Sequence, residues 1–276
     1  MSYSSLSFWI NATRFDRPAG SILLAVPMIL AFHLSPHFPG FLASYLLVLC
    51  VLARSLGCLI NDYADRDIDH LVTRTKNRAF AQGTMSFQSF IIMSLVLALC
   101  CATCFLELPY RTHAYCIAAP LWMMIYAWSK RWCPAPQLIL AVAFSWSILL
   151  IAKISFDTIP YSFYQLFIAN ALWVSGFDTT YALSDLKDDL ALPIYSLPKT
   201  LGLAASQYFS VLTLFLAQLL LINLYDPWNM MLCSSFFACK IAYDTLHMDR
   251  DPIAIFKSHC ILGFIWILET QGHGLY

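Results

Sequence analysis

Charge is scarce in this sequence, and what there is cancels. Charged residues make up 12% of the 276 residues, and 16 Lys and Arg stand against 16 Asp and Glu. Proteins that bind nucleic acid through its phosphates carry an excess of Lys and Arg, so we expect no nucleic-acid partner. The apolar fraction of 60% and the mean hydropathy of +0.67 instead indicate an integral membrane protein.

The signals of export are missing as well. The N-terminus has no basic start followed by a short apolar core and a small-residue cleavage site, so the first apolar run is predicted to be retained. An Arg-rich, acid-poor presequence is also lacking, which favours a bacterial inner membrane over a mitochondrial one. The cysteines lie mostly inside apolar segments, as Cys50, Cys58 and Cys100 do, and are predicted to be reduced.

Apolar runs recur at about the length that a bilayer requires, ~20 residues each. They predict an all-α, multi-pass membrane protein with nine transmembrane helices in a single bundle, and residues 1–276 are expected to form one domain. The predicted spans are residues 18–36, 41–61, 86–106, 112–129, 137–154, 160–181, 204–223, 228–245 and 257–272.

The loops predict the orientation, because Lys and Arg accumulate on the cytoplasmic side of a membrane. With the N-terminus inside, only Arg111 and Lys153 fall on the outer side. The segments that follow the second and sixth spans therefore face the cytoplasm, where we expect a cavity rich in aspartate. The inner side holds Arg14, Arg17, Arg66, Arg74, Lys76, Arg78, Lys130, Arg131, Lys187, Lys199, Arg250 and Lys257.

An acidic cluster follows the second span. On a helix, Asp62, Asp65 and Asp69 are spaced i, i+3 and i+7, so their carboxylates share one face, and Asn61 lies beside them. Like charges so placed repel one another. The cluster is therefore either a fully solvated loop or a cation site, and Mg²⁺ held by carboxylates and substrate phosphates is the usual occupant.

A second acidic cluster follows the sixth span and contains Asp178, Asp185, Asp188 and Asp189. Tyr181, Asp185 and Asp189 are again stacked on one helical face, at i, i+4 and i+8. A single acidic run is most often a solvated segment. Two runs, each at the end of an apolar helix and each on one face, favour a paired metal site.

Basic residues complete this picture. Arg54 lies inside the second span, about two turns deeper than Asp62, and an arginine at that depth usually faces a polar cavity. It either forms a structural salt bridge with an aspartate or binds a substrate carboxylate. Lys130 and Arg131 form a basic inner loop. Metal-bound diphosphate is a good leaving group when its carbon partner carries positive charge, as an allylic prenyl chain does, so the chemistry that fits is prenyl transfer.

The sequence resembles the UbiA superfamily of intramembrane prenyltransferases, in the branch that acts on 4-hydroxybenzoate. The run NDYADRDID at 61–69 is similar to the superfamily's NDxxDxxxD motif, and DTTYALSDLKDD at 178–189 is similar to its second aspartate motif. The family fold has nine helices. Further similar stretches are RFDRPAG at 14–20, ARSLGC at 53–58, SKRWCPAPQ at 129–137 and IFKS at 255–258.

The resemblance implies Mg²⁺-dependent transfer of a polyprenyl group from polyprenyl diphosphate to the ring carbon ortho to the hydroxyl of 4-hydroxybenzoate, in ubiquinone synthesis. It also implies roles for individual residues, with the bilayer supplying the prenyl substrate. Asp178 is a candidate proton acceptor, and Tyr181 accompanies it as a candidate catalytic residue. The metal-binding candidates are Asn61, Asp62, Asp65, Asp69, Asp185 and Asp189, and the substrate-binding candidates are Arg54, Arg74, Lys130, Arg131 and Lys199.

Two loops depart from the family pattern. Where relatives read NRPLPSG, residues 77–83 read NRAFAQG and lose both prolines, which makes the loop less rigid. Where relatives read Gly-x-Lys-Ser after the second motif, residues 193–196 read PIYS, and Lys199 follows as a possible substitute.

Other functions stay open at this point. Within the family, the acceptor could be a dihydroxynaphthoate or homogentisate instead of 4-hydroxybenzoate. Outside it, a cation-coupled transporter also carries carboxylates in its membrane helices. Depth separates these classes, because a transporter's site lies near the bilayer midplane, whereas these aspartates are predicted at one face.

Overall fold

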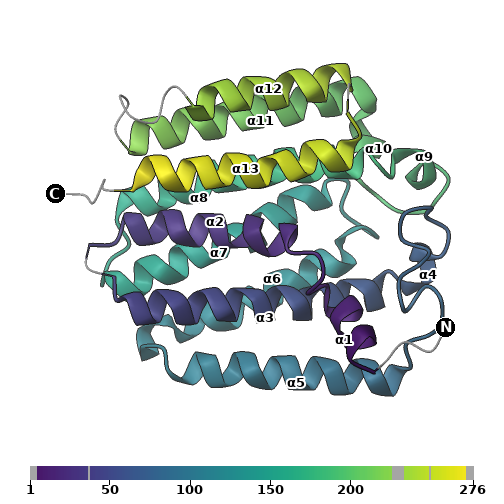
Figure 1. Ribbon diagram of the computed structural model, residues 1–276, viewed down its shortest axis with the longest axis horizontal. Helices are drawn as coiled ribbons and strands as arrows, with labels where there is room; N and C mark the ends of the chain where they lie inside the picture. Colours follow the sequence, from purple (N-terminus) through teal and green to yellow (C-terminus); the bar gives the residue numbers. More distant parts are fainter. Residues whose placement is uncertain (1–4, 37, 226–232, 249, 272–276) are drawn as a thin grey trace.

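The computed structural model describes residues 5–36, 38–225, 233–248 and 250–271, and every regular element within them is a helix. Figure 1 shows the long helices side by side in a bundle, with the short helices α4, α9 and α10 at one end. The bounds are α1 (Ser5–Thr13), α2 (Ala19–His33), α3 (Gly40–Ala64), α4 (Arg66–Asp69), α5 (Phe87–Leu106), η1 (Tyr110–Thr112), α6 (His113–Ser129), α7 (Pro136–Ser155), α8 (Tyr161–Ala182), α9 (Leu186–Asp189), α10 (Leu197–Leu201), α11 (Leu203–Leu224), α12 (Cys233–His247) and α13 (Pro252–Thr270).

The all-helical class predicted from the sequence is confirmed for the described residues. A long helix lies in each predicted span, and α3, α5, α7, α11 and α13 are long and apolar enough to cross a bilayer. The count of nine transmembrane helices therefore stays a prediction. Residues 228–232 and 272 of the last two predicted spans lie outside the described residues.

Local signals explain where several helices begin. Ser86 caps α5, because its hydroxyl accepts a hydrogen bond from the backbone N–H of Ser89 at 3.1 Å. Pro136 and Pro252 lie in the first turns of α7 and α13, where a missing N–H costs nothing. The last helix consequently begins at Pro252, five residues before the predicted boundary.

Helix α8 carries the second acidic cluster and packs against both α7 and α11. Gly176 permits the close approach to α11, since a Cβ there would lie 2.5 Å from Oγ1 of Thr213 and 3.0 Å from the carbonyl oxygen of Ser210. Trp173, one turn earlier on α8, is buried in the bundle core against Trp266 of α13. The apolar core thus fixes α8 and with it the direction in which its polar end points.

Neither acidic cluster lies on one continuous helix, so that part of the prediction is wrong. Helix α3 ends at Ala64 and α4 begins at Arg66, with φ −90° and ψ 5° at Asp65 between them. Likewise, α8 ends at Ala182, and Asp185 precedes α9 with φ −106° and ψ −3°. An unbroken helix would stack like charges on one face, whereas the breaks let single carboxylates meet basic side chains from other loops.

Helix α1 was not anticipated either. The spans predicted from the sequence begin at residue 18, but Ser5–Thr13 is helical. Arg14 follows it with φ 57°, an uncommon value for a residue with a Cβ. The backbone N–H of Phe15 donates to the carbonyl of Ile10 at 3.1 Å, which closes the end of the helix.

Candidate active site

The carboxylates of the first cluster are bound to arginines from two separate segments. Arg14, just after α1, contacts Oδ1 of Asp62. Arg78, in the loop after α4, lies 3.2 Å from the same oxygen and 2.7 Å from Oδ2 of Asp69. Both aspartates are buried. Charge-assisted contacts of this kind are strong, and removing one partner leaves a buried charge uncompensated.

Asp65 is the most deeply buried member of the cluster, with 1% of its surface exposed. Its Oδ2 accepts hydrogen bonds from Nζ of Lys130 at 2.8 Å and from the side-chain amide of Asn61 at 3.3 Å. Arg131 lies 3.6 Å from Oδ1 and also donates to the carbonyl of Ala64. Burial acts to lower the pKa of Lys130, but the charge of Asp65 overcomes it, so the pKa is raised and the ammonium stays charged.

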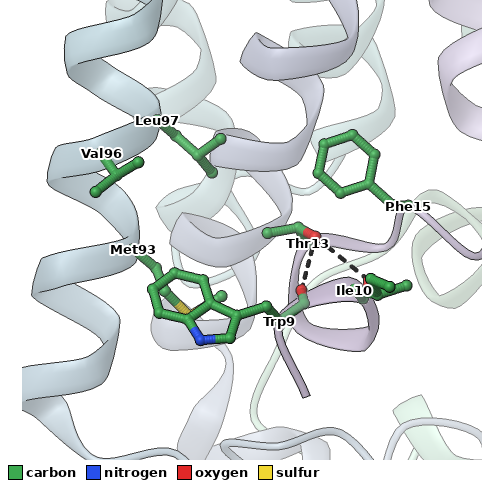
Figure 2. A pocket seen from close by; sticks show the side chains of 7 residues that line it. All are labelled: Trp9, Ile10, Thr13, Phe15, Met93, Val96 and Leu97. Atoms are coloured by element: carbon green, nitrogen blue, oxygen red, sulfur yellow. Dashed lines mark hydrogen bonds between the residues drawn. The ribbon is translucent and has the colours of Figure 1, made fainter. Parts of the chain in front are cut away.

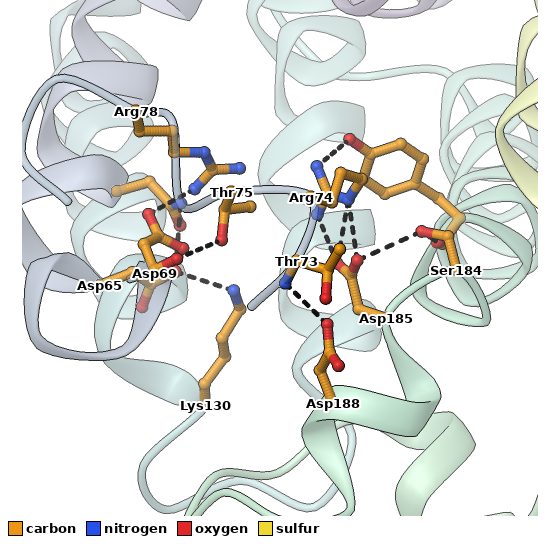
Figure 3. A network of polar contacts seen from close by, with 12 residues as sticks. Asp65, Asp69, Thr73, Arg74, Thr75, Arg78, Lys130, Ser184, Asp185 and Asp188 are labelled. Atoms are coloured by element: carbon orange, nitrogen blue, oxygen red, sulfur yellow. Dashed lines mark hydrogen bonds and ion pairs between the residues drawn. The ribbon is translucent and has the colours of Figure 1, made fainter. Parts of the chain in front are cut away.

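In the second cluster, a single arginine pairs with Asp185. Arg74 forms a two-pronged contact with Asp185, in which Nε donates to Oδ1 at 2.8 Å and a terminal nitrogen contacts Oδ2. Its other terminal nitrogen donates to the hydroxyl of Tyr181 at 2.7 Å, and the guanidinium lies 4.7 Å from the centre of that ring. Figure 3 shows Arg74 reaching from the loop to Asp185.

The last two aspartates of the second cluster lie in different surroundings. Asp188 is half-buried, and its Oδ2 accepts a solvent-exposed hydrogen bond from the backbone N–H of Thr73 at 2.7 Å, which lowers its pKa. Asp189 is buried, and burial raises its pKa although the Ser196 hydroxyl and Lys130 act against the rise. One carboxylate is therefore solvated while its neighbour faces inward.

A small cavity of about 30 Å³ joins the two clusters. By the same measure a water molecule needs roughly 10–15 Å³, so the cavity has room for an ion or a few waters but not for a diphosphate. Among the predicted site residues, six line it. They are Asp65, Asp69, Arg74, Lys130, Asp185 and Asp189, and Ile68, Val72, Thr75, Arg78 and Ile194 complete the wall.

The donor atoms around this cavity fit Mg²⁺. Oδ1 of Asn61 and Oδ1 of Asp65 are buried and accept no hydrogen bond in the structure. Uncommitted carboxylate and amide oxygens are the hard ligands that this ion prefers. Within the described residues, however, no three His, Cys, Asp or Glu side chains gather closely enough to hold a metal. The ligand types fit, and ion pairing keeps the carboxylates apart.

The remaining predicted residues lie around this centre rather than in it. Arg54 forms no salt bridge with an aspartate among the described residues; it donates to the carbonyl of Arg14 at 3.3 Å. Gly20 makes room for it, since a Cβ there would lie 2.6 Å from the guanidinium. Asp178 is half-buried on α8, one turn before Tyr181. Nζ of Lys199 donates to the carbonyl of Leu192 at 2.6 Å and does not line the cavity.

Sequence reasoning gave no role to Arg14 or Arg78, although both bind Asp62. The charge pattern of the loops placed both arginines on the inner side of the membrane and assigned them no partner. Their position in stretches similar to the family, RFDRPAG and the NR of residues 77–78, was the available signal. Their partner could not be deduced, because 48 residues separate Arg14 from Asp62.

A second pocket, of about 200 Å³, lies between the N-terminal segment and α5 and is lined by apolar groups (Figure 2). Its one hydroxyl, on Thr13, is committed to the carbonyls of Trp9 and Ile10. No titratable side chain lines it, so it offers no chemistry for a reaction. The lining residues are Trp9, Ile10, Thr13, Phe15, Met93, Val96 and Leu97.

Comparisons with known proteins agree on one family. The sequence model of the UbiA prenyltransferase family matches residues 20–268. A 4-hydroxybenzoate octaprenyltransferase from Neisseria meningitidis is 37% identical over 200 residues, which are 71% of this chain and 67% of that protein. One of the same name from Acidovorax ebreus is 32% identical over 280 residues, which are 98% of this chain and 97% of that protein.

Solved structures show the same fold. The apo structure of a UbiA homolog from Aeropyrum pernix K1 superposes with a TM-score of 0.79 at 20% identity, over 92% of this chain and 97% of that one. A UbiA homolog from Archaeoglobus fulgidus bound to GPP and Mg²⁺ gives a TM-score of 0.70 at 14% identity, over 95% of this chain and 98% of that one.

Proposed function

The chain belongs to the UbiA prenyltransferase family and is an integral membrane protein; from this premise we propose that it transfers a polyprenyl group to 4-hydroxybenzoate in ubiquinone synthesis. The donor is polyprenyl diphosphate, and the acceptor carbon is ortho to the hydroxyl. The observation that carries the proposal is the cavity that brings both aspartate motifs together with Arg74 and Lys130. The names of the relatives that are 32% and 37% identical support the acceptor.

Charge complementarity supports the donor assignment. Arg74 offers a planar fork and Lys130 a point charge, and both suit the oxygens of a diphosphate. Asn61, Asp62, Asp65, Asp69, Asp185 and Asp189 are the oxygen ligands that we assign to Mg²⁺. The Archaeoglobus fulgidus homolog is bound to GPP and Mg²⁺, which is consistent with this pairing of ligands.

The reaction breaks the bond between the allylic carbon and the diphosphate oxygen and forms a carbon–carbon bond to the ring. Mg²⁺ supplies charge neutralisation as the diphosphate leaves. Arg74 and Lys130 hold the diphosphate oxygens, and Arg54 binds the acceptor carboxylate. Asp178 takes the proton that the ring gives up, while Tyr181 orients Arg74 through its hydroxyl.

The location of the site is part of the proposal. Helices α4 and α9, which carry parts of the two aspartate motifs, lie at one end of the bundle (Figure 1). The basic residues Arg74, Arg78 and Lys130 line the cavity that joins these motifs. Because basic loops lie inside, we place this end in the cytoplasm and the protein in a bacterial inner membrane. Residues 1–276 act as one domain, which the family match over residues 20–268 supports.

The test measures prenylated product from polyprenyl diphosphate and 4-hydroxybenzoate in membranes that contain the protein, with and without Mg²⁺. Asp65→Asn and Asp189→Asn each lower the rate by at least about 100-fold, because each removes a charge that holds the metal. Asp67→Asn is the matched control, since Asp67 lies in the first motif but its side chain is 75% exposed. Its rate stays within about twofold of the parent.

The acceptor is tested in the same assay. Product from a dihydroxynaphthoate or homogentisate, with none from 4-hydroxybenzoate, would move the proposal to that acceptor. Absence of product with all three would contradict prenyl transfer to these aromatic acids.

A further inference from the structure

In the first aspartate cluster, arginine side chains pair with the carboxylates. A diphosphate attracts the same type of side chain. We propose that Arg14 and Arg78 form a latch on Asp62 and Asp69, and that a diphosphate opens this latch by drawing Arg78 away. Metal ion and diphosphate then bind together and neither binds well alone. This inference rests on the proposed function and adds the order and mutual dependence of binding.

The contacts of the latch leave Asp62 little freedom to bind a metal. Arg14 and Arg78 both contact its Oδ1, and Arg78 also holds Oδ2 of Asp69 at 2.7 Å. The four side chains are between 6% and 18% exposed. In such surroundings water screens the ion pairs weakly, so a metal ion must compete directly with the guanidinium groups.

The charges lining the cavity explain why neither ligand alone is favoured. Four carboxylates face three cationic side chains, Arg74, Arg78 and Lys130, so the cavity is close to neutral. A metal ion alone adds positive charge beside the three cations, and a diphosphate alone adds negative charge beside the aspartates. Together they add little net charge. The metal ion becomes the counter-ion of the aspartates, and the diphosphate becomes the counter-ion of the cationic side chains that leave them.

Space leads to the same conclusion. The cavity of about 30 Å³ is too small for a diphosphate, and Arg78 forms part of its wall. Arg78 lies in the loop between α4 and α5. Moving the Arg78 side chain to a phosphate oxygen enlarges the cavity, frees Oδ2 of Asp69 from its arginine and leaves Asp62 paired with Arg14 alone among the described residues.

Metal binding by the purified full chain in detergent tests the latch without an activity assay. Mn²⁺ serves as the paramagnetic probe and inorganic pyrophosphate as the diphosphate, with a correction for their complex in solution. In the parent, pyrophosphate raises Mn²⁺ affinity by about tenfold or more, and by linkage Mn²⁺ raises pyrophosphate affinity by the same factor.

Variants of the latch separate it from ordinary charge effects. Arg78→Gln binds Mn²⁺ alone about tenfold more tightly than the parent, and its gain from pyrophosphate falls below about threefold. Arg14→Gln also raises the affinity for Mn²⁺ alone and lowers the gain from pyrophosphate. It gives a second test if Arg78→Gln does not fold. Arg66→Gln is the matched control, because it removes the same charge next to Asp65 in the sequence. Within the part of the chain that the structure describes, the polar and ring contacts of Arg66 are with Asp67, the Tyr63 carbonyl and the Tyr63 ring.

The outcomes distinguish the latch from the proposed function. If Arg78→Gln and Arg14→Gln bind Mn²⁺ alone no more tightly than Arg66→Gln, the latch is overturned, while pyrophosphate-dependent Mn²⁺ binding by the parent keeps the metal site. If the parent binds no Mn²⁺ even with pyrophosphate, the metal and diphosphate site itself fails, and the latch fails with it.

Discussion

The two aspartate clusters sit across one cavity, yet they are held in different ways. Among the described residues, the second has one salt bridge, from Arg74 to Asp185, and its outer member Asp188 is held by a backbone N–H. The first is bound by Arg14, Arg78, Lys130 and Arg131, which come from three separate parts of the chain. The first cluster therefore has overlapping partners, whereas the second depends on a single side chain.

One loop connects the two clusters. Between α4 and α5, Thr73 and Arg74 reach the second cluster, and a few residues later Arg78 returns to the first (Figure 3). A ligand that displaces either arginine therefore acts on the segment that holds both clusters. This connection makes the difference between the clusters testable residue by residue.

The largest effect is expected at Arg74. Arg74→Gln lowers kcat/KM for polyprenyl diphosphate by about 100-fold, because no second base replaces it on Asp185. Arg131→Gln removes an equal charge from the first cluster, where Lys130 still holds Asp65 at 2.8 Å, and its kcat/KM falls less than about fivefold. Steady-state kinetics in membranes measures both. Equal losses in the two variants would show that the clusters do not differ in this way.

Arg74→Lys sharpens the same prediction. A lysine keeps the charge but lacks the planar fork that contacts both oxygens of Asp185 and the hydroxyl of Tyr181. It is expected to recover less than about a tenth of the lost activity. Full recovery would mean that charge alone matters at this position.

The all-helical class and the positions of the long helices could be predicted because hydrophobic length is a local property of the sequence. Each long helix begins or ends near its predicted boundary, and the second cluster lies at the end of α8 as expected. The helix breaks at Asp65 and Asp185 were not predictable from spacing, since i, i+3 and i+7 describe an ideal helix only. Both residues form ion pairs with distant segments, and the local sequence pattern does not contain such contacts.

The candidate site was predicted as a set of residues but not as a network. The two motifs do meet at one cavity, and Arg74 and Lys130 line it as expected. Lys199 does not, because its ammonium is held by the Leu192 carbonyl. Arg54 forms no salt bridge with an aspartate among the described residues and donates to the Arg14 carbonyl instead, so its binding of a substrate carboxylate stays a prediction. Such pairings depend on distances between elements far apart in sequence.

A smaller effect is expected on the free energy of unfolding when Lys130 is replaced. Lys130→Met removes the closest base from Asp65, which is 1% exposed, and lowers the free energy of unfolding by about 2 kcal/mol in the presence of chelator. Arg131 remains nearby, so the loss is smaller than for a charge left with no partner. Lys199→Met removes only a hydrogen bond to a carbonyl and costs less than about 1 kcal/mol. Thermal melting of both variants measures the difference, and a larger loss in Lys199→Met would reverse this assignment.

The smallest effect is on the pH dependence of stability, and it compares a buried aspartate in each cluster with the half-buried Asp188. Burial raises the pKa of Asp69 and of Asp189 above the ordinary 3.8. Between pH 3.8 and the raised pKa, the native state holds more protons than the unfolded state, so stability falls as pH rises through this window. The pKa of Asp188 is lowered, so its contribution is present above pH 3.8 and is lost as pH falls through the lowered pKa.

Three asparagine variants, melted in chelator across this pH range, separate these contributions. Asp69→Asn and Asp189→Asn each flatten the fall in stability above pH 3.8, because each removes a group that protonates more easily in the native state. Asp188→Asn instead removes stability above pH 3.8 and leaves the fall in place, since the Thr73 backbone loses a charged acceptor. If all three variants changed the slope of stability against pH in the same direction, the buried Asp69 and Asp189 would not differ from Asp188 in their solvation.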